Sequence, residues 1–318
     1  MTPVLPYLAP WYRLATTDGG VLLEYGQRII CLAGRAGTTL MPVLLPLLDG
    51  TRTLDEIVEV LGEPARPAIE AALERLDECE LLLEGPPLPT DVPAPESATA
   101  QLVVSLRPRE VTLGKAVASL RSRTTAIVGD GPTAVEVSRL LRQSGVQVRR
   151  EDAISSGADL FVCAPSSEQL TALGDWNAQA LASGQPWLQV LPFDGRYASV
   201  GPLYVPDETC CFDCFRLRRL ANLDAVDELQ ALEAARASYP ATPSLQALVA
   251  GLATTLALGW LVLRDHHAPS AFYAIELGQG IRMSLHHVHR VPRCHACSGL
   301  ADVAAPLPWH KEYRAVGA

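Results

Sequence analysis

Two Cys-x-x-Cys pairs carry the clearest chemistry in this 318-residue chain: Cys211 with Cys214, and Cys294 with Cys297. Each pair offers two thiolates from one tight turn, and two such turns complete a tetrahedral sulfur site for zinc. Disulfides and redox pairs are the alternatives, and Cys210 could replace Cys211 as a ligand. Four sulfurs leave no open coordination position, so we predict one structural zinc ion per chain that does not activate water.

Composition limits the partners and the compartment. The net charge of −9 argues against a general affinity for nucleic acid or for anionic membranes. The segment Met1–Leu14 is interrupted by prolines and lacks the basic-then-apolar order of a signal peptide. Ser244–Leu263 is uncharged and is the one membrane candidate, but its polar residues and glycines favour a buried helix. We therefore expect a cytoplasmic protein that binds neither nucleic acid nor a membrane.

The first 85 residues have the pattern of a small winged helix. Three short strands are predicted, at Trp11–Thr16, Val21–Tyr25 and Gln27–Ala33. Apolar spacing predicts one helix within Leu40–Leu48 and another over Pro64–Leu81, and a capping box at Thr53–Glu56 predicts a helix between them. A returning strand is predicted at Leu81–Leu83. This segment holds six arginines, no lysine and thirteen acidic residues, a net charge of −7. Such a charge excludes the DNA binding that many winged helices perform.

The rest of the chain has the pattern of an α/β domain. Residues 86–100 are proline-rich and are predicted to be a linker. Thr124–Val128 is a predicted strand that ends in Gly129-Asp130-Gly131 and is followed by a helix, an order typical of dinucleotide-binding turns. A tight turn without nucleotide is the alternative, and Pro132 removes one amide that could reach a phosphate. The prediction is a winged helix at 1–85, a linker at 86–100 and a Rossmann-like parallel-sheet domain at 101–318.

Residues 1–85 resemble the PqqD-like leader-recognition domain of gene clusters that make ribosomally synthesised, modified peptides. The resemblance rests on the strand order and on the segment Leu44–Ile57. In that family the leader peptide adds as an extra strand beside the third strand and packs on the third helix. The resemblance implies a leader site formed by Arg28, Ile30, Leu32, Arg66, Ile69 and Leu73.

The second domain resembles the ThiF–MoeB-like domain of ubiquitin-activating-type adenylating enzymes. The carrying features are both cysteine pairs, the apolar segment Leu245–Leu263 and three short motifs, Gly129-Asp130-Gly131, Asp159–Cys163 and Gly201–Tyr204. In that family an apolar helix of this kind is buried, and the domains usually pair through its region. The resemblance therefore also implies a homodimer.

Three departures from the ThiF pattern concern the nucleotide. The Asn-Leu-x-Arg-Gln segment that supplies a phosphate-neutralising arginine is missing after the second strand, and no lysine lies between Lys115 and Lys311. Ala164-Pro165-Ser166 replaces the acidic residue that would coordinate magnesium. Adenylation needs cations placed on the phosphates. We therefore expect Gly129 and Gly131 to mark a degenerate site, without ATP in this chain.

The combination resembles the partner proteins of YcaO-type cyclodehydratases, which form thiazoline and oxazoline rings in azole-containing peptides. This resemblance implies that the chain is not an enzyme on its own: it binds the leader of a precursor peptide and presents it to the YcaO enzyme, which uses ATP. An active ThiF-like enzyme that adenylates a peptide or carrier-protein carboxylate is the alternative. A winged-helix regulator with a zinc dimerisation domain is a third hypothesis, which the acidic first domain disfavours.

Overall fold

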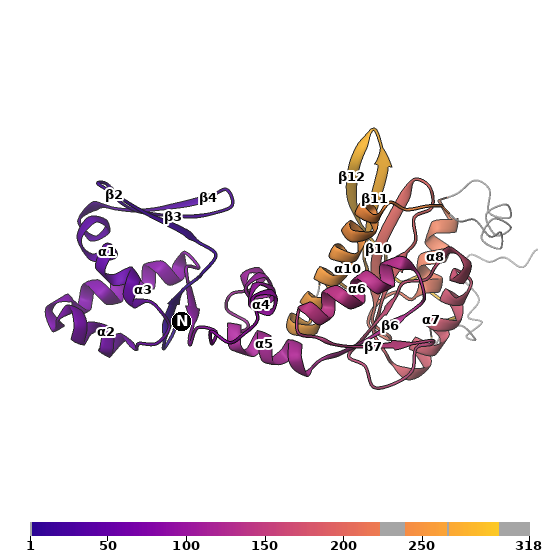
Figure 1. Cartoon of the computed structure of the whole chain (residues 1–318), viewed down its shortest axis with the longest axis horizontal. Helices are drawn as coiled ribbons and strands as arrows, with labels where there is room; N and C mark the ends of the chain where they lie inside the picture. Colours follow the sequence, from indigo (N-terminus) through magenta and orange to yellow (C-terminus); the bar gives the residue numbers. More distant parts are fainter. Residues whose placement is uncertain (1, 223–238, 266, 299–318) are drawn as a thin grey trace, which may run out of the picture. The chain divides into compact units, whose positions relative to one another are not determined.

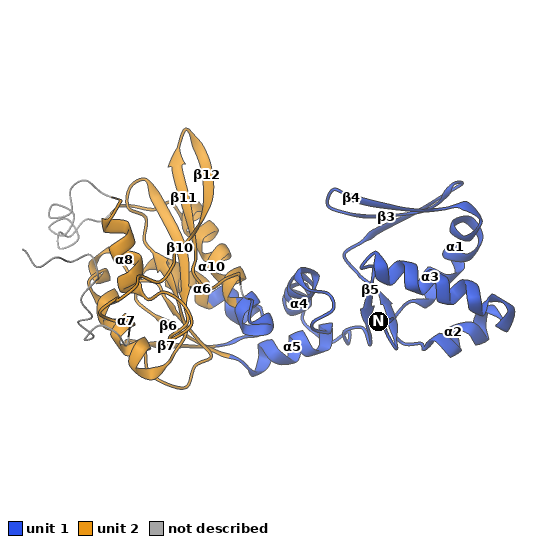
Figure 2. Ribbon diagram, turned by 180° about the vertical axis from the view of Figure 1, so that it is seen from behind, with its two compact units in different colours: residues 1–123, 139–147, 258–265 blue, residues 124–138, 148–257, 266–318 orange. Residues whose placement is uncertain are grey.

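The computed structural model describes residues 2–222, 239–265 and 267–298. Lys311 and the rest of the predicted second domain beyond residue 298 lie outside this range. By its internal contacts the chain divides into two compact units, coloured separately in Figure 2. Residues 1–123, 139–147 and 258–265 form the first unit, and residues 124–138, 148–257 and 266–318 form the second.

A three-stranded antiparallel sheet forms one layer of the first unit. Its strands are β2 (Arg13–Thr17), β3 (Gly20–Tyr25) and β4 (Arg28–Ala33), in the order β2-β3-β4. Two-residue turns, Asp18-Gly19 and Gly26-Gln27, join consecutive strands. The three strands predicted from the sequence are therefore confirmed.

Helices form the other layer of the first unit, on one side of the sheet (Figure 1). They are a π-helical turn (Ala36–Leu40), α1 (Met41–Leu44), a 3₁₀ turn (Leu45–Leu47), α2 (Leu54–Leu61), a 3₁₀ turn (Glu63–Ala65) and α3 (Arg66–Glu78). The apolar run before residue 48 is broken into short pieces because Pro46 cannot continue an α-helix. The predicted capping box is present: the Thr53 hydroxyl accepts the Glu56 N–H, and the Glu56 carboxylate accepts the Thr53 N–H at 2.7 Å.

A second, two-stranded sheet closes the first unit. It pairs β1 (Pro6–Leu8) with β5 (Leu82–Glu84) in antiparallel register. The sequence predicted the returning strand, but it missed β1, which has three residues and starts with a proline. Two helices follow, α4 (Ala94–Leu106) and α5 (Leu113–Ser122), whose apolar side chains share a core with Leu83. Because α4 begins at Ala94, inside the segment predicted to be a linker, only residues 86–93 of that segment lack regular secondary structure.

The second unit is built on a seven-stranded mixed sheet in the order β12-β11-β10-β9-β8-β6-β7. The strands are β6 (Thr124–Val128), β7 (Gln147–Glu151), β8 (Leu160–Cys163), β9 (Trp187–Leu191), β10 (Tyr197–Tyr204), β11 (Ala271–Gly278) and β12 (Gly280–His287). β6, β8 and β9 are parallel neighbours, as predicted. β9 to β12 pair antiparallel, and neither this antiparallel pairing nor the strands β10 to β12 were predicted.

Among the described residues, the α-helices of this α/β region are α6 (Pro132–Gln143), α7 (Ala172–Ser183), α8 (Phe212–Leu220) and α10 (Pro243–Leu263). Among the described residues, α10 is the one helix whose length and composition would allow it to cross a membrane. Of its most apolar stretch, 56% is buried inside the structure. The core helix of a globular protein has the same properties.

Candidate zinc site and peptide-binding edge

Two segments far apart in sequence bring four cysteines together. Cys211 immediately precedes α8 and Cys214 lies in its first turn, while Cys294 and Cys297 follow β12. Their Sγ atoms all lie within 4.8 Å of one another, with 3.8 Å between Cys211 and Cys214, 3.7 Å between Cys211 and Cys294, and 3.5 Å between Cys214 and Cys297. A tetrahedral zinc ion with Zn–S bonds of about 2.3 Å places its sulfurs about 3.8 Å apart. The four sulfurs therefore fit zinc, and they lie too far apart for disulfides, whose S–S bond is about 2.05 Å.

The structure also distinguishes Cys211 from its neighbour as a potential ligand. Cys211, Cys214 and Cys294 are almost fully buried, with exposed fractions of 2%, 0% and 1%. Cys210 is buried too, but its Sγ lies 3.9 Å from the Ser270 hydroxyl and is not part of the four-sulfur group. The Cys-x-x-Cys spacing therefore identifies the thiol that faces the other three.

Burial makes these thiols difficult to ionise without a cation. Burial raises the pKa of Cys211 far above the ordinary thiol value. Burial would raise the pKa of Cys214 as well, but a hydrogen bond from the backbone N–H of Val291, at 3.3 Å, helps to hold it below the ordinary value. A divalent metal ion bound between the four sulfurs would stabilise their thiolate forms.

Polar side chains fix α8 beside the four-sulfur group. The buried amide of Asn177 on α7 accepts the N–H of Phe212 at 3.1 Å and donates to the Asp213 carboxylate at 3.0 Å. Arg218 donates to the backbone carbonyls of His289 and Arg290, at 2.5 and 3.1 Å. These contacts tie α8 to α7 and to the chain after β12. The sequence does not reveal this role of Arg218, because backbone acceptors leave no sequence pattern.

The Gly129 turn between β6 and α6 is packed closely against the end of β8. Gly129 has a φ of +101°, and a Cβ atom added there would lie 2.5 Å from the Ala164 carbonyl oxygen. A Cβ atom on Gly131 would lie 2.7 Å from the Pro165 carbonyl oxygen. Backbone packing alone therefore explains both glycines, whether or not a nucleotide binds.

The amides of this turn are already engaged within the protein. The Gly131 N–H donates to the Ala164 carbonyl at 3.3 Å, and the Asp130 N–H donates to the Gln169 side chain at 2.9 Å. Pro132 has no N–H, and the Arg150 guanidinium is directed to the Gly129 carbonyl at 2.6 Å. A phosphate-binding turn points free backbone N–H groups at its ligand. The segment Gly129–Pro132 offers few of them.

In the first unit, β4 is an edge strand: among the described residues it pairs with β3 and has no neighbour on its other side. Arg28 faces Tyr25 across the two-residue turn, so this pair exchanges backbone hydrogen bonds, and such pairs alternate along an antiparallel ladder. The backbone groups that face β3 belong to Arg28, Ile30 and Leu32. The N–H and C=O groups that face outward belong to Ile29, Cys31 and Ala33.

The residues predicted to bind a leader peptide have different places in this unit. Ile30 and Leu32 are half-buried and pack on the core, where Ile69 and Leu73 are 0% and 2% exposed. These four apolar residues therefore support the sheet and offer little surface to a ligand.

The two predicted arginines are engaged in ion pairs, and Arg28 is exposed whereas Arg66 is half-buried. Arg28 lies 3.6 Å from Glu80, and Arg66 lies 2.9 Å from Asp55 and 2.7 Å from Glu63. The outward-facing residues Ile29, Cys31 and Ala33 were not among those predicted from the sequence. The two-residue turn, combined with strand alternation, could have identified them.

No protein-family model matches the chain, and no curated protein matches it significantly. Solved structures match it over most of its length. A heterocyclase solved with substrate and cofactor has a TM-score of 0.71 over 92% of this chain at 26% identity, and the heterocyclase TruD has 0.71 over 93% at 24%. E. coli MccB, solved with ATP, has a TM-score of 0.67 over 92% of this chain at 14% identity. The chain has a ThiF-like fold.

The ThiF-like chain spans different shares of these proteins. It covers 99% of MccB but only 39% and 43% of the two heterocyclases. The ThiF resemblance expected from the cysteine pairs and the Gly129 turn is thus confirmed as a fold. Each heterocyclase polypeptide contains more than half of its length beyond the part that matches.

Proposed function

We propose that this chain binds the leader of a ribosomally synthesised precursor peptide and presents it to a YcaO-type ATP-dependent cyclodehydratase that forms thiazoline and oxazoline rings. The match of nearly the whole chain to less than half of a heterocyclase, at 26% identity, carries this proposal. That heterocyclase is solved with substrate and cofactor.

The open edge of β4 is the proposed leader receptor. Ile29, Cys31 and Ala33 direct three N–H and three C=O groups away from β3, which is the pattern that an added strand requires. An unpaired edge is an aggregation hazard unless a partner covers it. Ile29 is 68% exposed beside this edge and provides an apolar contact for the incoming strand.

We propose that ATP is spent by the partner and not by this chain. The backbone N–H groups of Asp130 and Gly131 already donate hydrogen bonds within the protein, and Pro132 has none to offer a phosphate. Ala164-Pro165-Ser166 also stands where an acidic residue would coordinate magnesium. The second candidate function is a ThiF-like adenylating enzyme. The fold of MccB favours it, because MccB is solved with ATP and the chain covers 99% of it.

The proposed role of the metal is structural. Cys211, Cys214, Cys294 and Cys297 supply four sulfurs, so a zinc ion held by them has no position left for water or substrate. Bound there, zinc fixes the start of α8 to the segment after β12.

We further propose a homodimer located in the cytoplasm, which binds neither nucleic acid nor a membrane.

Leader binding is tested by fluorescence polarisation of a labelled precursor peptide with the full chain. The proposal expects tight binding of the intact precursor and of its isolated leader, and no binding of the core peptide that lacks the leader. Equal affinity for the leaderless peptide would remove the proposed role. A pyrophosphate-exchange assay on the same preparations tests the adenylating alternative.

A further inference from the structure

A cavity of about 340 Å³ lies in the second unit, between the start of α7, the end of β9 and α8. Its apolar lining includes Leu173, Leu191, Phe212 and Phe215. Among the residues that line it, none is a cysteine of the four-sulfur group or part of the Gly129 turn. The functions described above therefore leave this cavity without a role.

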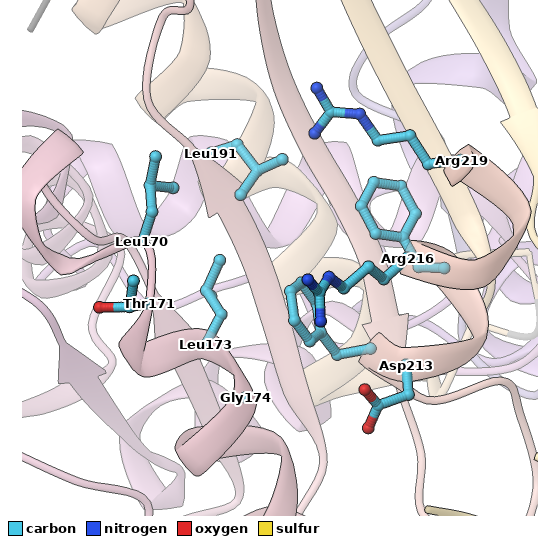
Figure 3. Close-up of a pocket in the computed structure, with 10 residues that line it drawn as sticks. Leu170, Thr171, Leu173, Gly174, Leu191, Asp213, Arg216 and Arg219 are labelled. Carbon is cyan, nitrogen blue, oxygen red and sulfur yellow. The ribbon is translucent and has the colours of Figure 1, made fainter. Parts of the chain in front are cut away.

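Two arginines give the cavity a cationic rim. Arg216 and Arg219 follow each other by one helical turn on α8, and Figure 3 shows both extending from the helix toward the space beside Leu191. The Arg219 guanidinium has no hydrogen bond or ion pair with any residue that the structure describes. The one carboxylate at the rim, Asp213, is held by the Asn177 amide at 3.0 Å.

We propose that this cavity binds a peptide segment in which an apolar side chain neighbours a carboxylate. A guanidinium forms two parallel hydrogen bonds to a carboxylate, and an apolar floor stabilises the adjacent side chain by removing it from water. The volume lies within the range of about 300–1,000 Å³ that is typical of ligand pockets. A polyanion such as a nucleotide triphosphate fits poorly, because it would leave the apolar floor unfilled and would meet Asp213.

The four-sulfur group determines one wall of this cavity. α8 starts directly after Cys211 and contains Cys214, so a metal held by these sulfurs also sets the position of Phe215 and Arg219. The choice of a peptide over a free metabolite rests on the proposed function, in which the ligands of this chain are peptides. The cavity is a second peptide site: it is formed by residues of the second unit, whereas the β4 edge belongs to the first.

Gly174 allows the cavity to be blocked without strain. It lies exposed in the first turn of α7, lines the cavity, and a Cβ atom added there meets no heavy atom within 4 Å. Gly174→Trp therefore places a bulky side chain at the wall of the cavity while the helix stays intact. Gly114→Trp is the matched control, because Gly114 is an exposed glycine in the first turn of α5 with the same free space.

The test measures fluorescence anisotropy of a labelled peptide, Gly-Ser-Leu-Asp-Phe-Gly-Ser, with the full chain. We expect saturable binding that Gly174→Trp abolishes and that Arg219→Gln weakens about tenfold, because a charge-assisted hydrogen bond is lost. An analogue with Asn in place of Asp should lose the same factor. Gly114→Trp and Arg282→Gln, which removes an exposed charge on β12, should leave the affinity unchanged.

Repeating the titration with Cys31→Pro, which blocks the β4 edge, separates the two peptide sites. Binding that persists in Cys31→Pro and disappears in Gly174→Trp supports the cavity. Binding that survives Gly174→Trp, or that disappears in Cys31→Pro, would overturn the cavity proposal and leave the leader proposal intact. An absence of binding at millimolar chain concentration would overturn it as well.

Discussion

Cys31 lies opposite Leu22 in the β3–β4 ladder, at a position where the two residues do not exchange backbone hydrogen bonds. The N–H of Cys31 therefore points away from β3 in the plane of the sheet, toward the side on which β4 has no neighbour among the described residues. Its side chain is exposed, so the residue can be changed without disturbing the core. This position is where the structure allows leader binding to be tested most cleanly.

Cys31→Pro should abolish most leader binding while the chain still folds. Proline is tolerated at edge positions whose N–H faces solvent, but it removes a donor that the added strand needs. The affinity should fall about ten- to a hundredfold, because one hydrogen bond is lost and one leader carbonyl is left without a partner. Fluorescence polarisation measures the affinity, and circular dichroism confirms the fold.

Two control variants accompany this measurement. Cys31→Ser keeps the N–H and should keep the affinity. Thr16→Pro removes an outward-facing N–H at the opposite edge, on β2, and should also bind normally. Ile30→Pro is unsuitable, because the Ile30 N–H faces β3 and its loss destabilises the sheet. Full leader affinity in folded Cys31→Pro would place the leader elsewhere.

The four-sulfur group predicts the metal content. Purified chain should contain about one zinc ion, and Cys214→Ser or Cys297→Ser should lower both the zinc content and the thermal midpoint, since metal binding contributes to the free energy of folding. Cys210→Ser should retain the metal, because its Sγ lies outside the group. Elemental analysis that finds folded, soluble chain without zinc would end the zinc hypothesis.

The Gly129 turn should serve packing and not nucleotide binding. Gly129→Ala should lower the free energy of unfolding by more than about 1 kcal/mol, because alanine is strained at positive φ and its Cβ meets the Ala164 carbonyl. Leader affinity should be unchanged, and ATP should not raise the thermal midpoint of the wild-type chain. Pyrophosphate exchange by the isolated chain would instead support the adenylating enzyme.

Dimerisation follows from the apolar helix α10. Leu248 on this helix is 38% exposed, and an apolar helix of this length needs cover on most sides. Light scattering should give the mass of a dimer, and Leu248→Glu should shift it toward the monomer. A strict monomer at micromolar concentration would contradict the predicted homodimer.

The sequence predicted the features that depend on local spacing. The two Cys-x-x-Cys pairs, the three strands before residue 34 and the capping box at Thr53 follow from turns and periodicity within a few residues. Strand pairing between distant segments was harder to predict from the sequence. β1 is too short to have a period, and the antiparallel pairing of β10 with β11 joins residues more than 70 positions apart.

The sequence also could not show what the apolar face of the third predicted helix, α3, contacts. An amphipathic pattern shows that Ile69 and Leu73 share a face, but it does not show whether that face meets the core or a ligand. In the structure both side chains are buried in the core of the first unit. Which backbone groups of β4 remain free depends on the register of its pairing, and the turn length sets that register.

The most direct test of leader presentation measures ring formation on the precursor by the partner cyclodehydratase. Mass spectrometry detects each ring as a decrease of one water in the mass of the precursor. The account predicts that ring formation with ATP requires this chain, is restored by the wild type and by Thr16→Pro, and is not restored by Cys31→Pro. An equal rate of ring formation without this chain, or full restoration by Cys31→Pro, would contradict it.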